Sequence, residues 1–365
     1  MRTRANPNST YERNIRSHLL VLGIGIVLLG LLGWFKRDPL LVEKYYSMSF
    51  YPIFSYVSAS VFGWVPFSVG DLFYGIFIVV GVVQTGKLLV RLVKRDWKGV
   101  SVRGLRFLIV CLGAYLYFYI NWGLHYYRIP LQQQLHLPVD RIDRSDYIAV
   151  LDRYVSEVNA LRSQLDTQQL DVPRARIELE DIMKNNEADF PMLSRTQVHA
   201  KEPLSNTLAS YLTVTGYLNP FTQEVHVNGK APKIAYPFTL IHELSHQMGI
   251  GFEDECNFIA FLVLREQDSI WYRYAAYYET IQYLLRPLYY EDKSLYQKYV
   301  NQLSEEVKND MKQERLFWTR YRGPIDDLTS MFYGKYLQHN NQPEGLARYS
   351  LMNRLVVAWE KTHTR

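Results

Sequence analysis

Three long apolar runs constrain how this chain can fold, because each is long enough to cross a bilayer as a helix. The first run carries no charge and follows four arginines, and no small-residue cleavage site comes after it, so it predicts an uncleaved anchor. Tyr, Trp and Phe gather near the ends of the other two, as in aromatic belts. We predict transmembrane helices at about 18–35, 71–92 and 105–122, which make residues 1–122 a membrane anchor.

Lysine and arginine are distributed unequally around these runs. Four arginines precede the first run, seven basic residues lie in the 87–106 loop, and only three lie between the first two runs. Loops richer in basic residues stay in the cytoplasm, so the amino terminus is predicted to lie inside. Three crossings then place residues 123–365 outside. In a double-membrane bacterium this means an inner-membrane anchor and a periplasmic domain.

One segment between the first two runs leaves this count open. Residues 51–69 are aromatic and contain Pro52, Gly63 and Pro66. We predict an interfacial or re-entrant piece rather than a fourth span. A fourth crossing would instead move the outer domain to the cytoplasm.

Composition narrows the class of protein. With 48% hydrophobic and 15% aromatic residues, the chain is not disordered. The net charge of +5 comes from the amino-terminal arm and the 87–106 loop, which predicts contact with anionic lipid and not with nucleic acid. The two cysteines, Cys111 and Cys256, are too far apart to pair, so no disulfide is predicted. Cys256 is interpreted as a small buried residue, and a zinc-ligand role is the lesser alternative.

The outer part of the chain, residues 123–365, lacks a further run apolar enough to span. Ser145 to Leu165 has apolar residues at helical spacing, whereas Leu212–Leu218 and Gln223–Gly229 have the composition and alternation of strands. We therefore predict a mainly helical α+β domain with a small sheet.

A metal-binding motif follows these strands. The run Pro237-Phe-Thr-Leu-Ile-His-Glu-Leu-Ser-His-Gln-Met-Gly249 contains H-E-x-x-H. On a helix capped at Thr239, His242 and His246 project from one face and can grip one metal ion. Glu243 can reach a water on that metal and act as general base. The motif predicts Zn²⁺ in a zincin-like domain, where the preceding strand offers a free edge to an extended peptide.

A zinc site of this kind needs a third protein ligand. Glu253, with Asn257 four residues on, resembles the E-x-x-x-D element of gluzincin metallopeptidases. Asn257 would then support a ligand histidine through a neutral hydrogen bond. In a second frame, Glu255 resembles the N-E-A or N-E-G ligand element of other gluzincins. We favour Glu253 and keep Glu255 as the alternative.

Two further residues are candidates for contact with the site or the substrate. His226, on the second predicted strand, could be a fourth polar group at the metal, although a solvent-facing histidine on an alternating strand is an equally good interpretation. Tyr349, at the start of the last predicted helix, could donate to an oxyanion.

Six stretches stand out along the chain: Ser68–Leu72, Trp122–Arg128, Asn219–Thr222, Pro237–Gly249, Glu253–Phe258 and Gly345–Tyr349. Together they resemble one family of bacterial membrane proteins that is catalogued only as a domain of unknown function. The resemblance covers most of the chain from the second apolar run onward. It implies a membrane-anchored, zinc-dependent hydrolase of the gluzincin sort and gives no substrate.

These features predict a membrane-anchored zinc metallopeptidase that acts on peptide or protein substrates of the envelope. The alternative is a non-catalytic, zincin-like envelope protein that binds a partner or a cell-wall component. Glu243 favours the enzyme, because a binding module has no need of a general base. Asn257 in place of an aspartate favours the alternative.

Overall fold

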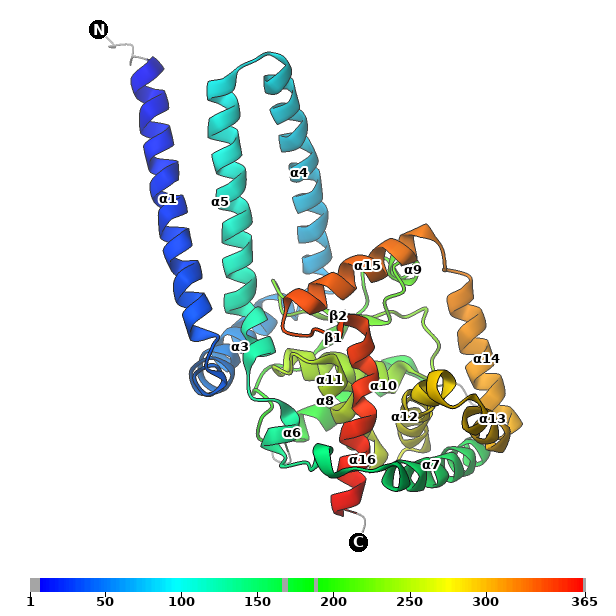
Figure 1. Ribbon diagram of the computed structural model, residues 1–365. Coiled ribbons are helices and arrows are strands. Elements are labelled where there is room, and N and C mark those ends of the chain that lie inside the picture. The colour runs from blue at the N-terminus through cyan, green and yellow to red at the C-terminus, as the bar shows by residue number, and fades with distance from the viewer. Residues whose placement is uncertain (1–6, 166–169, 187–189, 364–365) are drawn as a thin grey trace.

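Three long helices stand apart from the remainder of the chain (Figure 1). The computed structural model describes residues 7–165, 170–186 and 190–363. The long helices are α1 (Pro7–Phe35), α4 (Val69–Val93) and α5 (Trp97–Asn121). Each contains a stretch long and apolar enough to cross a membrane. The three predicted runs are confirmed as helices, and the chain is suited to membrane association.

The start of α5 differs from its prediction. The helix begins at Trp97 rather than near residue 105, because the Asp96 side chain caps it by accepting a hydrogen bond from the Gly99 N–H at 2.9 Å. The basic loop is therefore mostly helical.

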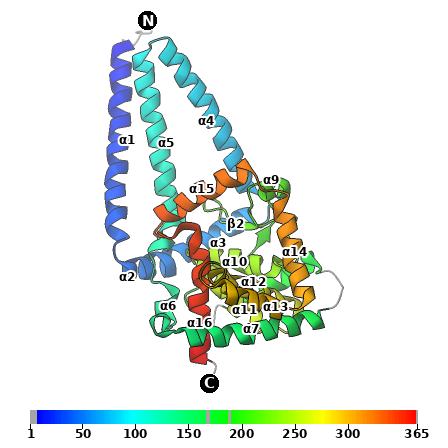
Figure 2. The ribbon, with the colours of Figure 1, turned by 45° about the vertical axis from the view of Figure 1, so that its right-hand side comes forward.

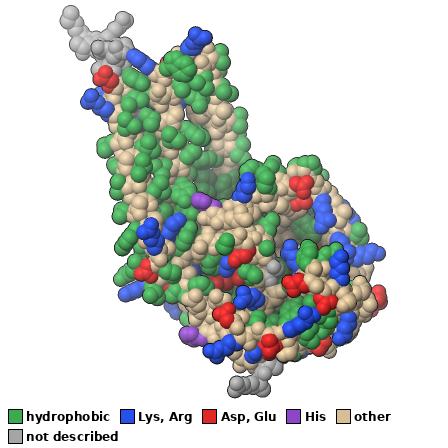
Figure 3. All heavy atoms as spheres, in the orientation of Figure 1, with side chains coloured by type: hydrophobic (Ala, Val, Ile, Leu, Met, Phe, Trp, Pro, Cys, Tyr) green, Lys and Arg blue, Asp and Glu red, His purple; other side chains and the backbone are tan. Residues whose placement is uncertain are grey.

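The three long helices extend from the same side of the remaining domain (Figures 1 and 2). The amino-terminal end of α1 and the turn between α4 and α5 lie at the end remote from that domain (Figures 1 and 2). Hydrophobic side chains cover the helices, and Lys and Arg side chains gather near their remote tips (Figure 3). Each helix thus meets the domain at its opposite end.

The segment between α1 and α4 folds as α2 (Pro39–Leu41), the π-helix η1 (Val42–Phe50) and α3 (Tyr51–Phe62). Helix α3 continues η1 without a break, and one side of it is buried at Tyr51, Ser55, Ser58 and Ala59. Buried Tyr51 donates a hydrogen bond to Gln223 Oε1 at 2.7 Å and to the Gln247 carbonyl oxygen at 2.9 Å. In the described residues, 51–69 therefore packs against the outer domain and adds no fourth candidate span.

The outer domain is built around two buried helices, α10 (Tyr236–Gln247) and α11 (Glu253–Arg265). Its other helices surround this pair (Figures 1 and 2). They are η2 (Gly123–Tyr127), α6 (Leu131–Gln134), η3 (Val139–Arg141), α7 (Arg144–Gln164), α8 (Val172–Asn185), α9 (Asn206–Tyr211), α12 (Ile270–Glu291), α13 (Lys293–Gln302), α14 (Glu305–Thr319), α15 (Pro324–His339), η4 (Gly345–Leu351) and α16 (Met352–His363). The predicted class, apolar helices followed by a mainly helical domain with a small sheet, is confirmed.

The sheet has three short strands in the order β1 (Ala200–Lys201), β3 (Val225–Val227), β2 (Gly216–Leu218). β3 pairs in parallel with β1 and antiparallel with β2. The strand preceding α10 is thus central, and the prediction that it offers a free edge is wrong. Within this sheet β1 and β2 are the two edge strands, and β2 is the one that pairs antiparallel with β3.

A buried ion pair joins the sheet to α3 and α4. Lys201 Nζ lies 2.8 Å from Glu224 Oε1, and both side chains are almost fully buried. Glu224 also accepts hydrogen bonds from the N–H groups of Val69 and Gly70, at the start of α4. The ammonium of Lys201 donates to the Phe62 carbonyl oxygen at 2.6 Å, at the end of α3. One charged pair therefore fixes the sheet to both flanking helices.

We expect Glu224→Ala to lower the free energy of unfolding by about 3–5 kcal/mol, because it leaves the Lys201 ammonium buried without its carboxylate. Asp181→Ala is the control, since it removes the exposed partner of Lys184 and should cost about 1 kcal/mol or less. Thermal and denaturant unfolding of the full chain in detergent measures both. Equal losses for the two variants would contradict the structural role of the pair.

Candidate metal centre

The H-E-x-x-H motif lies on α10, and its two histidines, His242 and His246, are one turn apart on the same face of that helix. The helix begins at Tyr236, three residues before the predicted cap at Thr239, because Pro237 fits the first turn, where a missing N–H costs nothing. The rings of His242 and His246 lie edge to face with centroids 4.8 Å apart. Both are buried among the core residues of the domain.

The turn after α10 returns the chain so that α11 starts above these rings. Gly249 has φ +90°, a conformation that side chains rarely adopt, and an added Cβ would meet His125 Cε1 and Ser194 Oγ at 2.9 Å. The reversal places Glu253, the first residue of α11, against the two histidines of α10.

Three potential ligand atoms converge at this point. Glu253 Oε2 lies 3.1 Å from His242 Nε2 and 3.4 Å from His246 Nε2. Donor atoms bound at 2.0–2.2 Å to one tetrahedral zinc ion lie about 3.3–3.6 Å from one another. These two separations are close to what such an ion requires, so Glu253 Oε2 and the two Nε2 atoms could hold a metal.

The remaining ring nitrogens are held by acceptors. His242 Nδ1 lies 2.7 Å from Asn257 Oδ1, and His246 Nδ1 lies 2.8 Å from the carbonyl oxygen of Ile250. Because an amide or carbonyl oxygen only accepts, both Nδ1 atoms carry the proton in the neutral rings. The lone pair of each Nε2 then faces Glu253, as a metal ligand must.

Glu253 is a carboxylate with a separate partner for each oxygen. Burial by itself would raise its pKa, but the two neighbouring imidazoles lower that pKa well below the usual range. Its Oε1 accepts a hydrogen bond from the Tyr333 hydroxyl at 2.7 Å, which leaves Oε2 for the histidines. Tyr333 lies on α15, eighty residues away, and no local pattern in the sequence indicates this contact.

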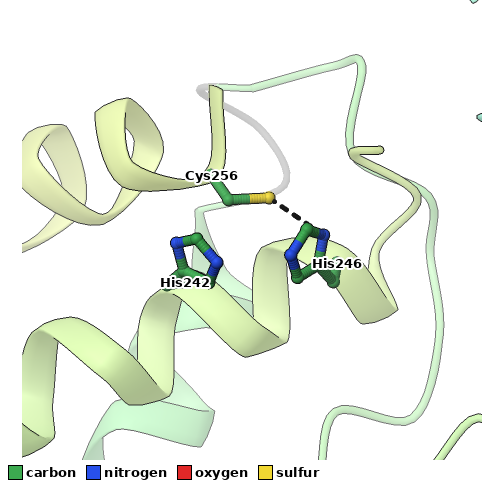
Figure 4. Close-up of side chains that lie close together, drawn as sticks. All are labelled: His242, His246 and Cys256. Carbon is green, nitrogen blue, oxygen red and sulfur yellow. Dashed lines mark hydrogen bonds between the residues drawn. The ribbon is translucent and has the colours of Figure 1, made fainter. Parts of the chain in front are cut away.

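Cys256 also approaches the histidines (Figure 4). The ligand atoms of His242, His246 and Cys256 all lie within 4.8 Å of one another, so this set too could hold a metal. However, Cys256 Sγ lies 3.2 Å from Nδ1 of His246, on the side of the ring that points away from Glu253. Burial raises the pKa of this thiol to about 12 while no metal is bound. The Nε2 atoms with Glu253, and the set that includes Cys256, are therefore two alternative ligand sets.

The alternative ligand, Glu255, points elsewhere. Its Oε1 accepts a hydrogen bond from the Leu131 N–H at 2.6 Å, at the start of α6. Burial, reinforced by the charge of Asp254, raises the pKa of Glu255 to about 8, so the group is largely protonated at neutral pH. Glu255 is thus engaged with α6, and Glu253 is the carboxylate that contacts the two histidines.

Glu243 lies beside the edge strand β2. An added Cβ on Gly216 would meet Glu243 Cγ at 2.6 Å and Oε1 at 2.8 Å, so only glycine leaves room for this carboxyl. Burial raises the pKa of Glu243 to about 7, the range in which a group can both accept and return a proton at neutral pH.

Two of the predicted residues are not placed at the centre. The ring of His226 is buried and stacks on Tyr217 at 4.5 Å, and burial lowers its pKa to about 4. Its charged neighbours, Asp71 and Glu224, belong to the junction with α4. The solvent-facing interpretation of His226 is therefore wrong. Tyr349 falls in η4, and its side chain lies outside the described residues.

A family model with the description "Protein of unknown function (DUF3810)" matches residues 46–357. The match begins within η1 and ends within α16, so it covers α4, α5 and the outer domain. No curated protein and no solved structure matches the chain.

We expect Glu253→Gln to weaken zinc binding by more than about 100-fold, because it removes a negatively charged metal ligand. This loss exceeds the one that is typical when a residue that only hydrogen-bonds a metal ligand is removed. Glu255→Gln is the matched control two residues along the same helix, and it should bind zinc as the parent protein does. Competition with a chromophoric chelator measures both affinities. The reverse order of losses would assign the ligand to Glu255.

Proposed function

The chain belongs to the DUF3810 family, and we propose that this member is a membrane-anchored zinc metallopeptidase. The observation that carries the proposal is the convergence of Glu253 Oε2 with Nε2 of His242 and of His246, at 3.1 and 3.4 Å. Glu243 lies between the two histidines in sequence and next to them in space. Two imidazoles and one carboxylate form the ligand set of many zinc peptidases, and their fourth position is left for water.

A bound zinc ion would supply Lewis acidity and a water whose pKa falls to about 7. Glu243 would take the proton of that water and pass it to the leaving amine. Its buried position suits both steps, because its raised pKa of about 7 lets it exchange protons at neutral pH. Asn257 and the Ile250 carbonyl oxygen hold the two rings in the tautomer that this arrangement needs.

The edge of β2 supports a peptide substrate over a small one. Gly216, the first residue of β2, touches the side chain of Glu243, and β2 is paired on one side only within its sheet. An extended peptide that adds to this edge would bring its carbonyl groups past the general base. The proposed domain is zincin-like in this sense: a short sheet beside the helix that carries the motif.

The proposed location follows from charge and helix direction. Basic side chains gather at the tips remote from the outer domain (Figure 3). If those tips lie in the cytoplasm, α1, α4 and α5 deliver the outer domain to the opposite face of the membrane. For an inner membrane this is the periplasm, and the substrates are peptides or proteins of the envelope.

Metal content and turnover together test the proposal. The purified full chain should hold about one zinc per molecule, and a peptide library analysed by mass spectrometry should show cleavage that a chelator abolishes. Glu243→Gln should keep its zinc and lose the cleavage by a factor of about 100 or more, since the general base is gone. A chain without zinc, or one that holds zinc but shows no cleavage, would favour the non-catalytic binding protein.

Zinc affinity should rise with pH. Burial opposes protonation of His246, but Cys256 and the Glu253 carboxylate outweigh it and raise the pKa of the metal-free histidine well above its usual value. A proton on His246 must leave before the ring can bind, so affinity increases as pH rises towards that pKa and falls as pH drops. We expect affinity at pH 6 to be more than about tenfold weaker than at pH 8, measured by chelator competition. Equal affinities would contradict this proton linkage.

A further inference from the structure

The helix α15 presents an apolar stripe on its outer side. Ile325, Leu328, Met331 and Phe332 are 52, 52, 47 and 61% exposed. At 100° per residue these positions share an arc of about 120°. The other side of α15 faces the domain: Asp326 accepts a hydrogen bond from Thr213, and Tyr333 donates one to Glu253. Large apolar side chains on one side of a helix indicate a surface that is covered by another phase or partner.

The height of α15 along the membrane helices is fixed by its contacts with α5. Its carboxyl-terminal end touches α5 through Tyr336, which lies 5.9 Å from the Phe118 ring, and through His339, whose Nε2 lies 3.2 Å from the Tyr115 hydroxyl. Tyr115 and Phe118 belong to the candidate span Trp97–Asn121. Tyr115 is six residues before the end of that helix, or about 9 Å inside it. This end of α15 therefore lies at the depth of the last turns of α5.

A second contact places the neighbouring part of the domain at the same depth. The Phe221 ring lies 5.8 and 5.9 Å from Phe73 and Tyr74 of α4, and it stacks on Tyr117 of α5 at 5.7 Å. These three aromatic residues also belong to candidate spans. An aromatic cluster at this level is typical of the boundary between hydrocarbon and water.

The short helix α9 continues the apolar surface beside α15. Leu204 and Leu208 are 48 and 57% exposed, and the Leu204 N–H donates to Asp71 Oδ2 at 2.9 Å, in the first turn of α4. Hydrophobic side chains form a rim on the upper side of the outer domain that faces the long helices (Figure 3). The exposed apolar residues of this region thus lie on the side of the domain that faces the long helices.

We propose that the exposed stripe of α15, together with Leu204 and Leu208, is embedded in the interfacial layer of the bilayer that α1, α4 and α5 cross. The lipid is favoured over a second protein because the stripe adjoins the spans and lies at the depth of their outer turns. Lys335 is exposed among the apolar positions, and its long stem can carry the ammonium to the headgroups. An apolar stripe with a basic residue at its border is the pattern of an interfacial helix.

This docking has a consequence for substrates that rests on the proposed function. The same helix that would lie in the lipid carries Tyr333, whose hydroxyl holds Glu253 at 2.7 Å. The proposed catalytic centre is therefore one side chain away from the membrane surface. The substrate class that fits is a polypeptide tethered to that bilayer, whose segment next to the membrane reaches the site.

Depth-dependent quenching tests the docking. The full chain carrying Cys111→Ser is given a single label site, Phe332→Cys, and reacted with an environment-sensitive fluorophore; the native Cys256 is buried. The protein is reconstituted in vesicles of phosphatidylcholine and phosphatidylglycerol, with or without lipids that carry a nitroxide on the acyl chain. Two controls are Asp327→Cys, on another side of α15, and Ser156→Cys, on α7 at the end of the domain remote from the long helices (Figures 1 and 2).

We expect blue-shifted emission and loss of most of the signal to nitroxide lipid at position 332, and neither effect at position 156. Position 327 should be quenched less than position 332, because it lies off the stripe. Emission at 332 that matches 156 would overturn the proposal, and so would a blue shift without lipid quenching, which indicates a second protein on this face. If Phe332→Cys does not fold, Leu208→Cys on α9 is labelled in its place. None of these fluorescence measurements needs zinc or turnover. The proposal that α15 docks to the membrane and the proposal that the protein is a peptidase can therefore be refuted independently.

Discussion

The buried carboxylate of Glu253 is the charge around which the outer domain is arranged. It is 2% exposed, and a carboxylate at that depth costs several kcal/mol unless partners compensate it. The partners come from two other elements: the two histidines of α10 and Tyr333 of α15. Segments up to ninety residues apart in sequence are thus held together by one negative charge. Removing that charge leaves two imidazoles and a phenol facing one another in the core.

A second buried charge, Glu224, holds the outer domain to the long helix α4 by the same principle. It accepts hydrogen bonds from the first N–H groups of α4, where a helix dipole favours a negative charge, and it pairs with Lys201. The positive member in turn donates to carbonyl oxygens at the end of α3 and in the loop after it. The domain is therefore coupled to α4 by specific hydrogen bonds, and its orientation relative to the long helices is defined.

The sequence allowed some of this to be predicted and not the remainder, for physical reasons. The three apolar helices and the geometry of His242 and His246 depend on local spacing, which a single sequence contains. The reversal that brings Glu253 to the histidines is also local, because it is set by the glycines that follow α10. By contrast, Tyr333 and Gly216 reach the centre through tertiary packing, and no short pattern marks them. His226 was placed on a strand correctly, but its burial against Tyr217 depends on α4, which lies far away in sequence.

α15 belongs both to the surface next to the long helices and to the centre. On its outer side are the apolar residues of the stripe, and on its inner side Tyr333 contacts the proposed ligand Glu253. A helix is stiff over one turn, so a displacement of Phe332 moves Tyr333 with it. If the stripe lies in lipid, the depth of α15 in the bilayer sets the position of Tyr333. The position of Tyr333 in turn affects Glu253 Oε1, to which its hydroxyl donates a hydrogen bond. A soluble form of the domain would lack that support, even with every ligand residue intact.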